Sequence, residues 1–374
     1  MIKYFRFRTF AKIALGAVAL GALGTVAYLQ LPLFGAMAGG ERLERMKKSS
    51  NFVDGVFQNP IDTPMMTMEL SEMPAMLTGF LRSGQLGPTQ AIPAMKTDLK
   101  ALNAADDLVI WLGHSSFYVQ MGGQRILLDP VFSDSASPVP GTNRAFAGSS
   151  IYAAEDMPAI DLLLITHDHY DHLDYPSILA LKSKVKKVIT GLGVGAHFER
   201  WGYDPQVLHE VDWHDAIDAS ATLQIRATPG RHFSGRGLTR NKSLWVGFVL
   251  RTPERRIYFS GDSGYGPHFS EIGQKYGPFD WVTVDSGQYD PRWANVHMTP
   301  EQAAQAAEDV GARAFTPGHI GRFTLAAHTW DDPFRRGVAA SEGRGYMLWT
   351  PQIGQPIYLD ARAQTFEPWW ESLN

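Results

Sequence analysis

A short apolar run that ends in a dense group of histidines and aspartates constrains this chain most. Residues 162–174 read LLLITHDHYDHLD, so a segment typical of a buried strand is followed at once by three histidines and three aspartates. In an extended loop alternate side chains point the same way, so His167 and His169 can share one metal ion. Asp171 and His172 are neighbours that point differently, so they can reach a second ion, and the loop predicts a two-metal site. Three other residues of the loop are expected to stay outside this site: Asp168, Tyr170 and Asp174.

Three further apolar strands also end in a residue that can bind metal. The segments TLQIRATPGRH, RRIYFSGDSGYG and ARAFTPGHIGRF deliver His232, Asp262 and His319. His232 and His319 each follow a strand and a Pro-Gly turn, whereas Asp262 lies among small residues that let the backbone approach an ion. Since the loops after several strands can converge, we expect these residues to join the histidine loop in one site.

The composition limits the chemistry of such a site. The chain has no cysteine, which excludes disulfides, thiolate metal ligands and cysteine nucleophiles. A metal must then be held by His, Asp or Glu, which favours zinc, manganese or iron. Two ions about 3.5–4 Å apart can hold a hydroxide and stabilise the charge that develops during a displacement, so hydrolysis is the expected reaction. A net charge of −4 argues against a general nucleic-acid-binding protein.

Hairpins and helices alternate in the same part of the chain. Residues 108–130 read as two strands that turn at Gly122-Gly123. Residues 300–310 predict a helix with Thr299 as N-cap and Gln302 completing a capping box, and a second helix is expected soon after the histidine loop. This mixture predicts an α/β architecture in which helices cover more than one sheet.

The first 40 residues predict a membrane segment. The stretch from Ile13 to Phe34 carries no charge, and about 20 residues of helix are enough to cross a bilayer. The basic residues before it predict a cytoplasmic N-terminus and a catalytic domain on the exported, periplasmic side: Lys3, Arg6, Arg8 and Lys12. Cleavage near Ala38 followed by secretion is the alternative, because AMA at 36–38 looks like a signal-peptidase site.

These features divide the chain into three parts. Residues 1–40 are expected to form the basic flank and the anchor, and residues 41–105 a lead-in segment that packs on the catalytic domain. Residues 106–374 are expected to form the catalytic domain itself.

The ligand pattern, H-x-H-x-D-H followed by a distant His, Asp and His, resembles that of metallo-β-lactamase-fold hydrolases. Four longer segments resemble the branch that hydrolyses N-acylphosphatidylethanolamine as a phospholipase D: WLGHSSFYVQMGGQRILLDPVFSDSASP, LLITHDHYDHLDYPSILAL, FSGDSGYGPHFSEIGQKYGPFD and YDPRW. The resemblance runs from about Asn51 to the C-terminus. It implies an αββα sandwich with two zinc ions at one edge of the paired sheets.

The resemblance also implies roles for individual residues. By motif position one zinc would be held by three histidines, the other by an aspartate and two histidines, and Asp262 would bridge both: His167, His169 and His232 for the first, and Asp171, His172 and His319 for the second. Asp171 would position the nucleophile. Members of this branch release phosphatidic acid and an N-acylethanolamine, and they commonly form homodimers with a membrane-facing entrance, so a phospholipid substrate and a homodimer are expected.

Departures from the branch leave the substrate open. The branch usually reads like IHWGTF around the last ligand, where this chain has GHIGRF at 318–323, and Arg322 adds a cation that favours an anionic phosphate or a smaller acidic substrate. Substrate contacts, or groups behind the metal ligands, are expected at six positions: His114, Asp129, Tyr289, His297, Arg322 and His328. A phospholipase of the D type is the first interpretation. A sugar-phosphate lactonase, β-lactamase or other esterase is the second, and a non-enzymatic envelope binding protein, which has no need for seven converging ligands, is the third.

Overall fold

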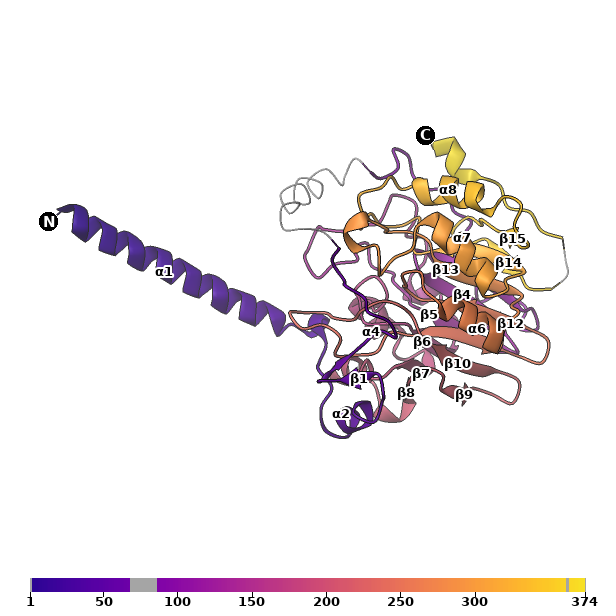
Figure 1. Ribbon diagram of the computed structural model, residues 1–374, viewed down its shortest axis with the longest axis horizontal. Coiled ribbons are helices and arrows are strands. Elements are labelled where there is room, and N and C mark those ends of the chain that lie inside the picture. Colours follow the sequence, from indigo (N-terminus) through magenta and orange to yellow (C-terminus); the bar gives the residue numbers. More distant parts are fainter. Residues whose placement is uncertain (1, 68–85, 361–362, 374) are drawn as a thin grey trace.

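The computed structural model describes residues 2–67, 86–360 and 363–373, with side chains from Leu15 onward (Figure 1). Two sheets form its centre. The first has the order β16-β3-β4-β5-β6-β7-β8 and the second the order β15-β14-β13-β12-β11-β10-β9. The strands of the first sheet are β3 (Leu108–Gly113), β4 (Ser116–Met121), β5 (Gln124–Leu128), β6 (Ile160–Ile165), β7 (Val185–Gly191), β8 (Leu208–Val211) and β16 (Pro356–Tyr358). Those of the second are β9 (Ala216–Asp218), β10 (Gln224–Thr228), β11 (Gly247–Arg251), β12 (Arg256–Phe259), β13 (Trp281–Asp285), β14 (Ala314–Gly318) and β15 (Met347–Leu348).

Each sheet is antiparallel in one part and parallel in the other. Strands β3 to β5 pair antiparallel and β5 to β8 parallel, and the second sheet repeats this division at β12. The sheets face each other across an apolar core in which Phe117 of the first packs edge-on against Phe259 and Trp281 of the second. The parallel halves place several strand ends on the same edge, and this edge carries the histidine loop.

Helices cover the outer faces. On the first sheet these are α4 (Tyr175–Leu181) and α5 (Gly195–Arg200), whose buried side chains join the core of that face. On the second they are α6 (His268–Tyr276) and α7 (Pro300–Asp309), with α8 (Asp332–Ser341) joined to α7 by the Arg336–Glu301 ion pair. The expected αββα sandwich is confirmed. Among the described residues there are also five short 3-10 helices: η1 (Pro32–Phe34), η4 (Ala154–Asp156), η5 (Pro205–Val207), η6 (Pro291–Trp293) and η7 (Trp369–Leu373).

The helices and strands predicted from local sequence signals are present in the structure, with one exception. Helix α7 has the predicted capping box between Thr299 and Gln302, and Gly122-Gly123 form the turn between β4 and β5 with positive φ at both residues. The stretch predicted as two strands is instead three, because the chain also turns at His114-Ser115 between β3 and β4. His114 adopts φ +55°, a conformation that histidine seldom adopts, so the sequence does not signal this turn.

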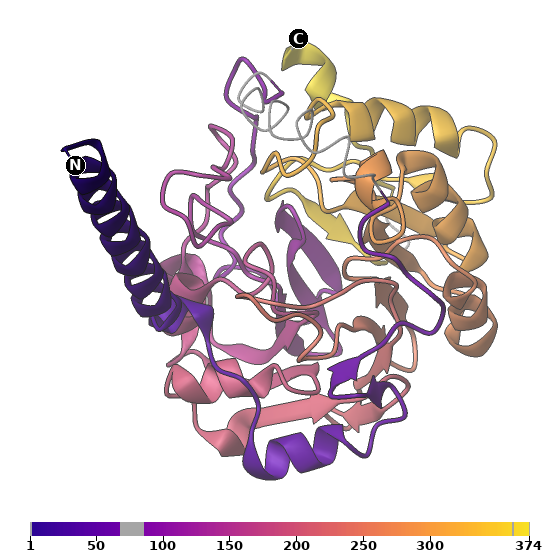
Figure 2. The ribbon, with the colours of Figure 1, turned by 60° about the vertical axis from the view of Figure 1, so that its left-hand side comes forward.

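The N-terminal helix α1 (Ile2–Leu29) projects away from the body (Figures 1 and 2). In the part of the chain that the structure describes, no helix combines the length and the apolar character needed to cross a bilayer, so the predicted anchor is not confirmed. After α1 the chain lies along the body that holds the two seven-stranded sheets, through α2 (Gly40–Met46), β1 (Phe52–Val53) and β2 (Val56–Phe57). Arg42 of α2 forms ion pairs with Glu199 and Glu210, and Phe57 is fully buried. The part of the lead-in segment at 68–85 lies outside the described residues.

Candidate metal centre

The predicted ligands come together at the ends of four strands. The histidine loop follows β6, and the other three positions follow β10, β12 and β14: His232, Asp262 and His319. Ligand atoms of one group lie within 4.8 Å of one another: His167, His169, His232 and Asp262. A second group is equally compact: His114, Asp171, His172 and His319. A third overlaps both: Asp262, His297 and His319.

Asp262 lies between the first two groups and turns one oxygen to each. Its Oδ2 is 3.7 Å from Nε2 of both His167 and His232. Its Oδ1 is 3.1 Å from His172 Nε2 and 3.2 Å from His319 Nδ1. One carboxylate therefore faces two separate sets of imidazoles, as a bridge between two cations would.

The donor atoms suit a metal rather than a hydrogen-bond network. His169 Nδ1 is 2.8 Å from His167 Nε2 and 3.3 Å from His232 Nε2, so imidazole nitrogens crowd around one point. Burial and the neighbouring imidazoles lower the pKa of His167 well below its ordinary value, and burial does the same for His232, so both carry free lone pairs. His172 Nε2 and Asp262 Oδ1 are buried and 3.1 Å apart, but neither forms a hydrogen bond with the other or with any other described residue. A cation at each group would satisfy these atoms.

Asp129 lies behind the ligands. Its Oδ2 is 2.8 Å from Nδ1 of His172, and its Oδ1 accepts a hydrogen bond from Thr166 N at 2.8 Å. The Thr166 hydroxyl also contacts Asp129 Oδ2 at 2.5 Å and His167 Nδ1 at 3.0 Å. Such partners fix the tautomer and orientation of ligating imidazoles. Asp129 thus has the orienting place expected for it, and Thr166 is a member that the sequence did not indicate.

His114 and His319 are joined through their backbones. His114 N donates to Ile320 O at 3.1 Å and His319 N donates to His114 O at 3.2 Å, while both histidines have positive φ. Because of these two backbone hydrogen bonds, His114 lies in the second group, where its Nε2 is 2.9 Å from Asp171 Oδ2. The sequence predicted His114 as a substrate contact or a group behind the ligands, and in the structure it lies within the second group itself.

His297 forms a pair with Asp285 that the sequence did not reveal. Its Nδ1 is 2.7 Å from Asp285 Oδ2, and its ring is stacked on His319 with centroids 5.1 Å apart. Burial opposes protonation of His297, but Asp285 raises its pKa above the ordinary value. Asp285 ends β13 in the segment WVTVDSG, so the signal that singled out Asp262 was available here too.

Three residues predicted as substrate contacts or as groups behind the ligands belong to none of the three metal-binding groups found among the described residues. Arg322 is buried and donates to Leu112 O, Ser133 O and Ser150 Oγ, so its guanidinium links strand β3 to two later segments. Burial lowers the pKa of Arg322 to about 10. Tyr289 and His328 stack on each other with centroids 4.2 Å apart, and neither supplies an atom to the three metal-binding groups found among the described residues.

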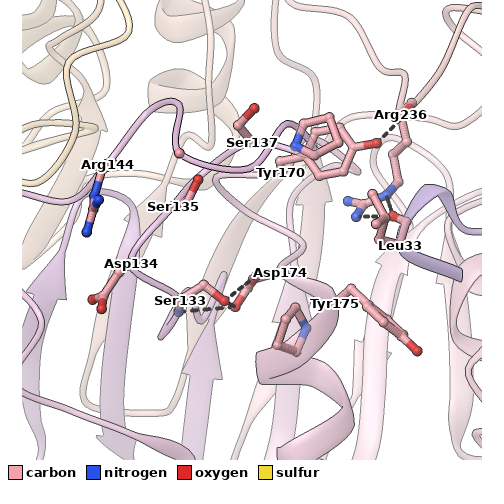
Figure 3. Close-up of a pocket in the computed structure, with 13 residues that line it drawn as sticks. Leu33, Ser133, Asp134, Ser135, Ser137, Arg144, Tyr170, Asp174, Tyr175 and Arg236 are labelled. Carbon is pink, nitrogen blue, oxygen red and sulfur yellow. Dashed lines mark hydrogen bonds between the residues drawn. The ribbon is translucent and has the colours of Figure 1, made fainter. Parts of the chain in front are cut away.

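The loop residues predicted to stay outside the site hold the loop in place. Asp168 accepts hydrogen bonds from Gly235 N at 2.7 Å and Ser243 Oγ at 2.9 Å. Asp174 caps α4 by accepting from Ser177 N. Tyr170 lines a cavity of about 360 Å³ beside the histidine loop (residues 167–174), which we call the metal loop, and Arg236 and Leu33 line the cavity next to Tyr170 (Figure 3).

Comparison with known proteins shows the family to which the chain belongs. Residues 124–320 match the profile described as the Beta-lactamase superfamily domain. The chain belongs to this superfamily. An uncharacterized protein of Mycobacterium bovis is 36% identical over 96% of this chain and 96% of its own length. The N-acyl-phosphatidylethanolamine-hydrolyzing phospholipase D 1 of Caenorhabditis elegans is 31% identical over 58% of this chain and 64% of its own, so the resemblance to that branch is confirmed.

Solved structures agree on the fold of this superfamily member. Igni18, a metallo hydrolase from the archaeon Ignicoccus hospitalis, superposes with a TM-score of 0.52 over 69% of this chain and all of its own, at 19% identity. At that identity the likeness concerns the fold alone. Together with the His and Asp clusters, the family places this chain among metal-dependent hydrolases.

Proposed function

We propose that this chain is a dinuclear zinc phosphodiesterase of the phospholipase D type that acts on N-acylphosphatidylethanolamine-like phospholipids. The observation that carries the proposal is Asp262, whose two oxygens face two different groups of imidazoles. Two ions would be held by His167, His169 and His232 for the first and by Asp171, His172 and His319 for the second, and Asp262 would serve both. When bound, the two ions would supply Lewis acidity at the phosphoryl oxygens and a water activated for attack.

The protein's own groups would orient the attack. Asp171 is held through Oδ2 by His114 Nε2 at 2.9 Å, so its carboxylate has one fixed direction. It would accept a hydrogen bond from the attacking water as the new P–O bond forms. Asp129 holds the His172 ring from behind and keeps the second group of ligands in register.

The Asp285–His297 pair is the candidate group for the departing alcohol. Asp285 occupies His297 Nδ1, which leaves Nε2 as the atom that can meet a substrate oxygen. In the proposed reaction the P–O bond to the headgroup alcohol breaks, and His297 would pass its Nε2 proton to that oxygen, while the attacking water would give up a proton to the Asp171 carboxylate. The products would be phosphatidic acid and an N-acylethanolamine.

A cavity lies beside the metal loop, and none of the candidate metal ligands is among its lining residues. It is about 360 Å³ in volume and is lined by Leu33, Tyr170 and Tyr175 together with the charged side chains of Asp134 and Arg144 (Figure 3). We also propose that the chain forms a homodimer and that its N-terminal region contacts a membrane.

Metal analysis followed by substrate panels tests the function. We expect about two zinc ions per chain and release of N-acylethanolamine from N-acylphosphatidylethanolamine in mixed micelles. Phosphatidylcholine, a lactone panel and a β-lactam panel serve as comparisons, with Asp262→Asn as the inactive control. Turnover of lactones or β-lactams without phospholipid hydrolysis would reject the phospholipase proposal while leaving the metal-dependent hydrolase in place.

A further inference from the structure

A single buried arginine holds both ends of the metal loop. Arg236 is 5% exposed, and its Nη1 donates to Asp168 O at 2.8 Å and to Leu173 O at 2.7 Å. These two carbonyls enclose the stretch 169–172, which contains three of the candidate ligands. A guanidinium has five N–H groups in a rigid plane, so it can tie separate backbone segments at fixed distances where a flexible ammonium cannot.

The same guanidinium reaches the N-terminal region. Its Nε and Nη2 donate to Leu33 O at 3.1 and 2.7 Å, and its plane lies over the Tyr170 ring with 4.1 Å between the guanidinium carbon and the ring centroid. Figure 3 shows Leu33 and Tyr170 on either side of Arg236. All four of these side-chain hydrogen bonds go to backbone carbonyls. Arg236 therefore joins residue 33 to a loop more than 130 positions later in the chain.

Residues 30–36, which we call the leader, are seated firmly enough to serve as a support. Trp201 Nε1 donates to Pro32 O at 2.8 Å, and Ala36 N donates to His197 Nδ1 at 3.0 Å. Gly35 has φ +70°, and a Cβ there would lie 1.9 Å from His197 Nδ1, so only glycine fits this approach. Phe34 packs edge-on against Tyr170 with centroids 6.3 Å apart.

A purely structural role for a buried arginine is the alternative, and Arg322 is the comparison within this chain. Arg322 is also buried and also donates to carbonyls, but these belong to Leu112 and Ser133, outside the metal loop. Arg236 differs because its partners bracket the ligands and because it stands four residues after His232, itself a candidate ligand.

We propose that Arg236 is a positioning residue that holds the metal loop in its binding geometry, and that the leader is part of the metal-binding unit because it completes the arginine's set of acceptors. The inference rests on the proposed metal site. It predicts that weakening the leader or the arginine loosens the loop and reduces metal affinity without removing any ligand.

The test uses Arg236→Lys, which keeps the charge and loses the planar donor set, and Phe34→Ala, which weakens the leader, both in the full chain. Arg226→Lys is the matched control, because the Arg226 guanidinium also donates to a backbone carbonyl, that of His214, far along the chain from the metal loop. Zinc affinity is measured by competition with a chromophoric chelator. Hydrogen exchange is measured on the backbone amides of 167–174, and the visible absorption of the cobalt-substituted protein reports the ligand geometry.

For Arg236→Lys we expect zinc affinity to fall by roughly 10- to 100-fold, as when other groups behind metal ligands are lost, together with faster exchange in the loop and an altered cobalt spectrum. Phe34→Ala should shift the same three readouts in the same direction by less. The double variant should lose less than the product of the single losses, since both act through Leu33. Arg226→Lys should leave all three readouts unchanged.

A folded Arg236→Lys protein with unchanged zinc affinity and loop exchange overturns the proposal, as does a loss of thermal stability alone. If Arg236→Lys does not fold, Phe34→Ala becomes the deciding variant. Zinc affinity, loop exchange and a cobalt spectrum equal to those of wild type in Phe34→Ala would then overturn the proposal. These outcomes can be distinguished from a failure of the proposed function, because measuring zinc affinity or backbone hydrogen exchange requires no substrate. A wild type that binds zinc but hydrolyses no phosphodiester removes the proposed function and leaves the role of Arg236 intact.

Discussion

His114 Nε2 and Asp171 Oδ2 lie 2.9 Å apart inside the protein, although 57 positions separate the two residues in the chain. The contact depends on a turn in which His114 has φ +55° and is paired through its backbone with Ile320. The contact fixes the direction of the Asp171 carboxylate, which belongs to the second group of ligands.

Asp171→Asn should abolish turnover while zinc is largely retained. An amide of nearly the same size cannot accept the hydrogen bonds of both His114 and the attacking water as a carboxylate does, so we expect the rate to fall by about 10²–10⁴-fold. The measurement is kcat beside zinc content on the same preparation. Undiminished turnover would remove Asp171 from the mechanism.

His114→Gln tests the orienting contact directly. Glutamine can reach Asp171 with one N–H but lacks the rigid ring, so we expect activity or zinc affinity to fall by roughly 10-fold, and by up to about 100-fold for His114→Phe, which donates nothing. His209→Gln, at a partly exposed histidine outside the metal groups, is the matched control. Equal effects of Gln and Phe at position 114 would show that packing, not the hydrogen bond, is what matters.

Removal of metal should lower the stability of the whole domain. The ligands come from the ends of four strands in two sheets, so metal binding ties the sheets together, and ligand present at 100 times its Kd adds about 2.7 kcal/mol. Calorimetry before and after chelation should show a lower Tm that added zinc restores. Asp262→Asn should show a low Tm that responds little to zinc, and a full zinc response in that variant would contradict the bridging role.

The Asp285–His297 pair should matter in proportion to the leaving group. We expect His297→Gln and Asp285→Asn to slow hydrolysis of an alkyl phosphodiester by about 10²–10⁴-fold, because the departing alkoxide is strongly basic. A nitrophenyl phosphodiester, whose leaving group is a weak base, should be slowed far less. Parallel losses on both substrates would assign the pair to binding instead of to the departing oxygen.

His268 should contribute to the loss of stability in acid. Burial lowers its pKa in the folded state from 6.5 to about 3, and its Nε2 lies 3.1 Å from Ser263 Oγ. Below pH 6.5 the unfolded chain binds a proton that the folded state excludes, so this stability is present above pH 6.5 and is lost as the pH falls toward 3. In His268→Gln the fall in the free energy of unfolding between pH 6.5 and 4, measured by urea titration of the chelated protein, should be shallower. A slope equal to that of wild type would mean that His268 is protonated in the folded state.

Much of the site could be predicted because its signals are local. Alternation in the histidine loop separated His167 and His169 from Asp171 and His172, and the structure places these pairs in two different groups. Strand ends indicated His232, Asp262 and His319 for the same reason, since a run of apolar residues that stops at a ligand is visible without the fold. The capping box of α7 belongs to this class too, because all its contacts lie within four residues.

What escaped prediction depends on contacts between residues far apart in the chain. The sequence by itself determined the ligand types, their division along the loop and an α/β architecture with more than one sheet, because these follow from composition, spacing and alternation; the αββα arrangement was implied by the family resemblance. Only the tertiary structure decided that His114 meets Asp171, that Asp285 holds His297, and that Arg322 faces loop carbonyls while Arg236 binds the metal loop. Those pairings arise when two sheets pack and bring strand ends, turns and the leader to one edge, and no spacing along the chain encodes which of its many polar side chains will then be neighbours.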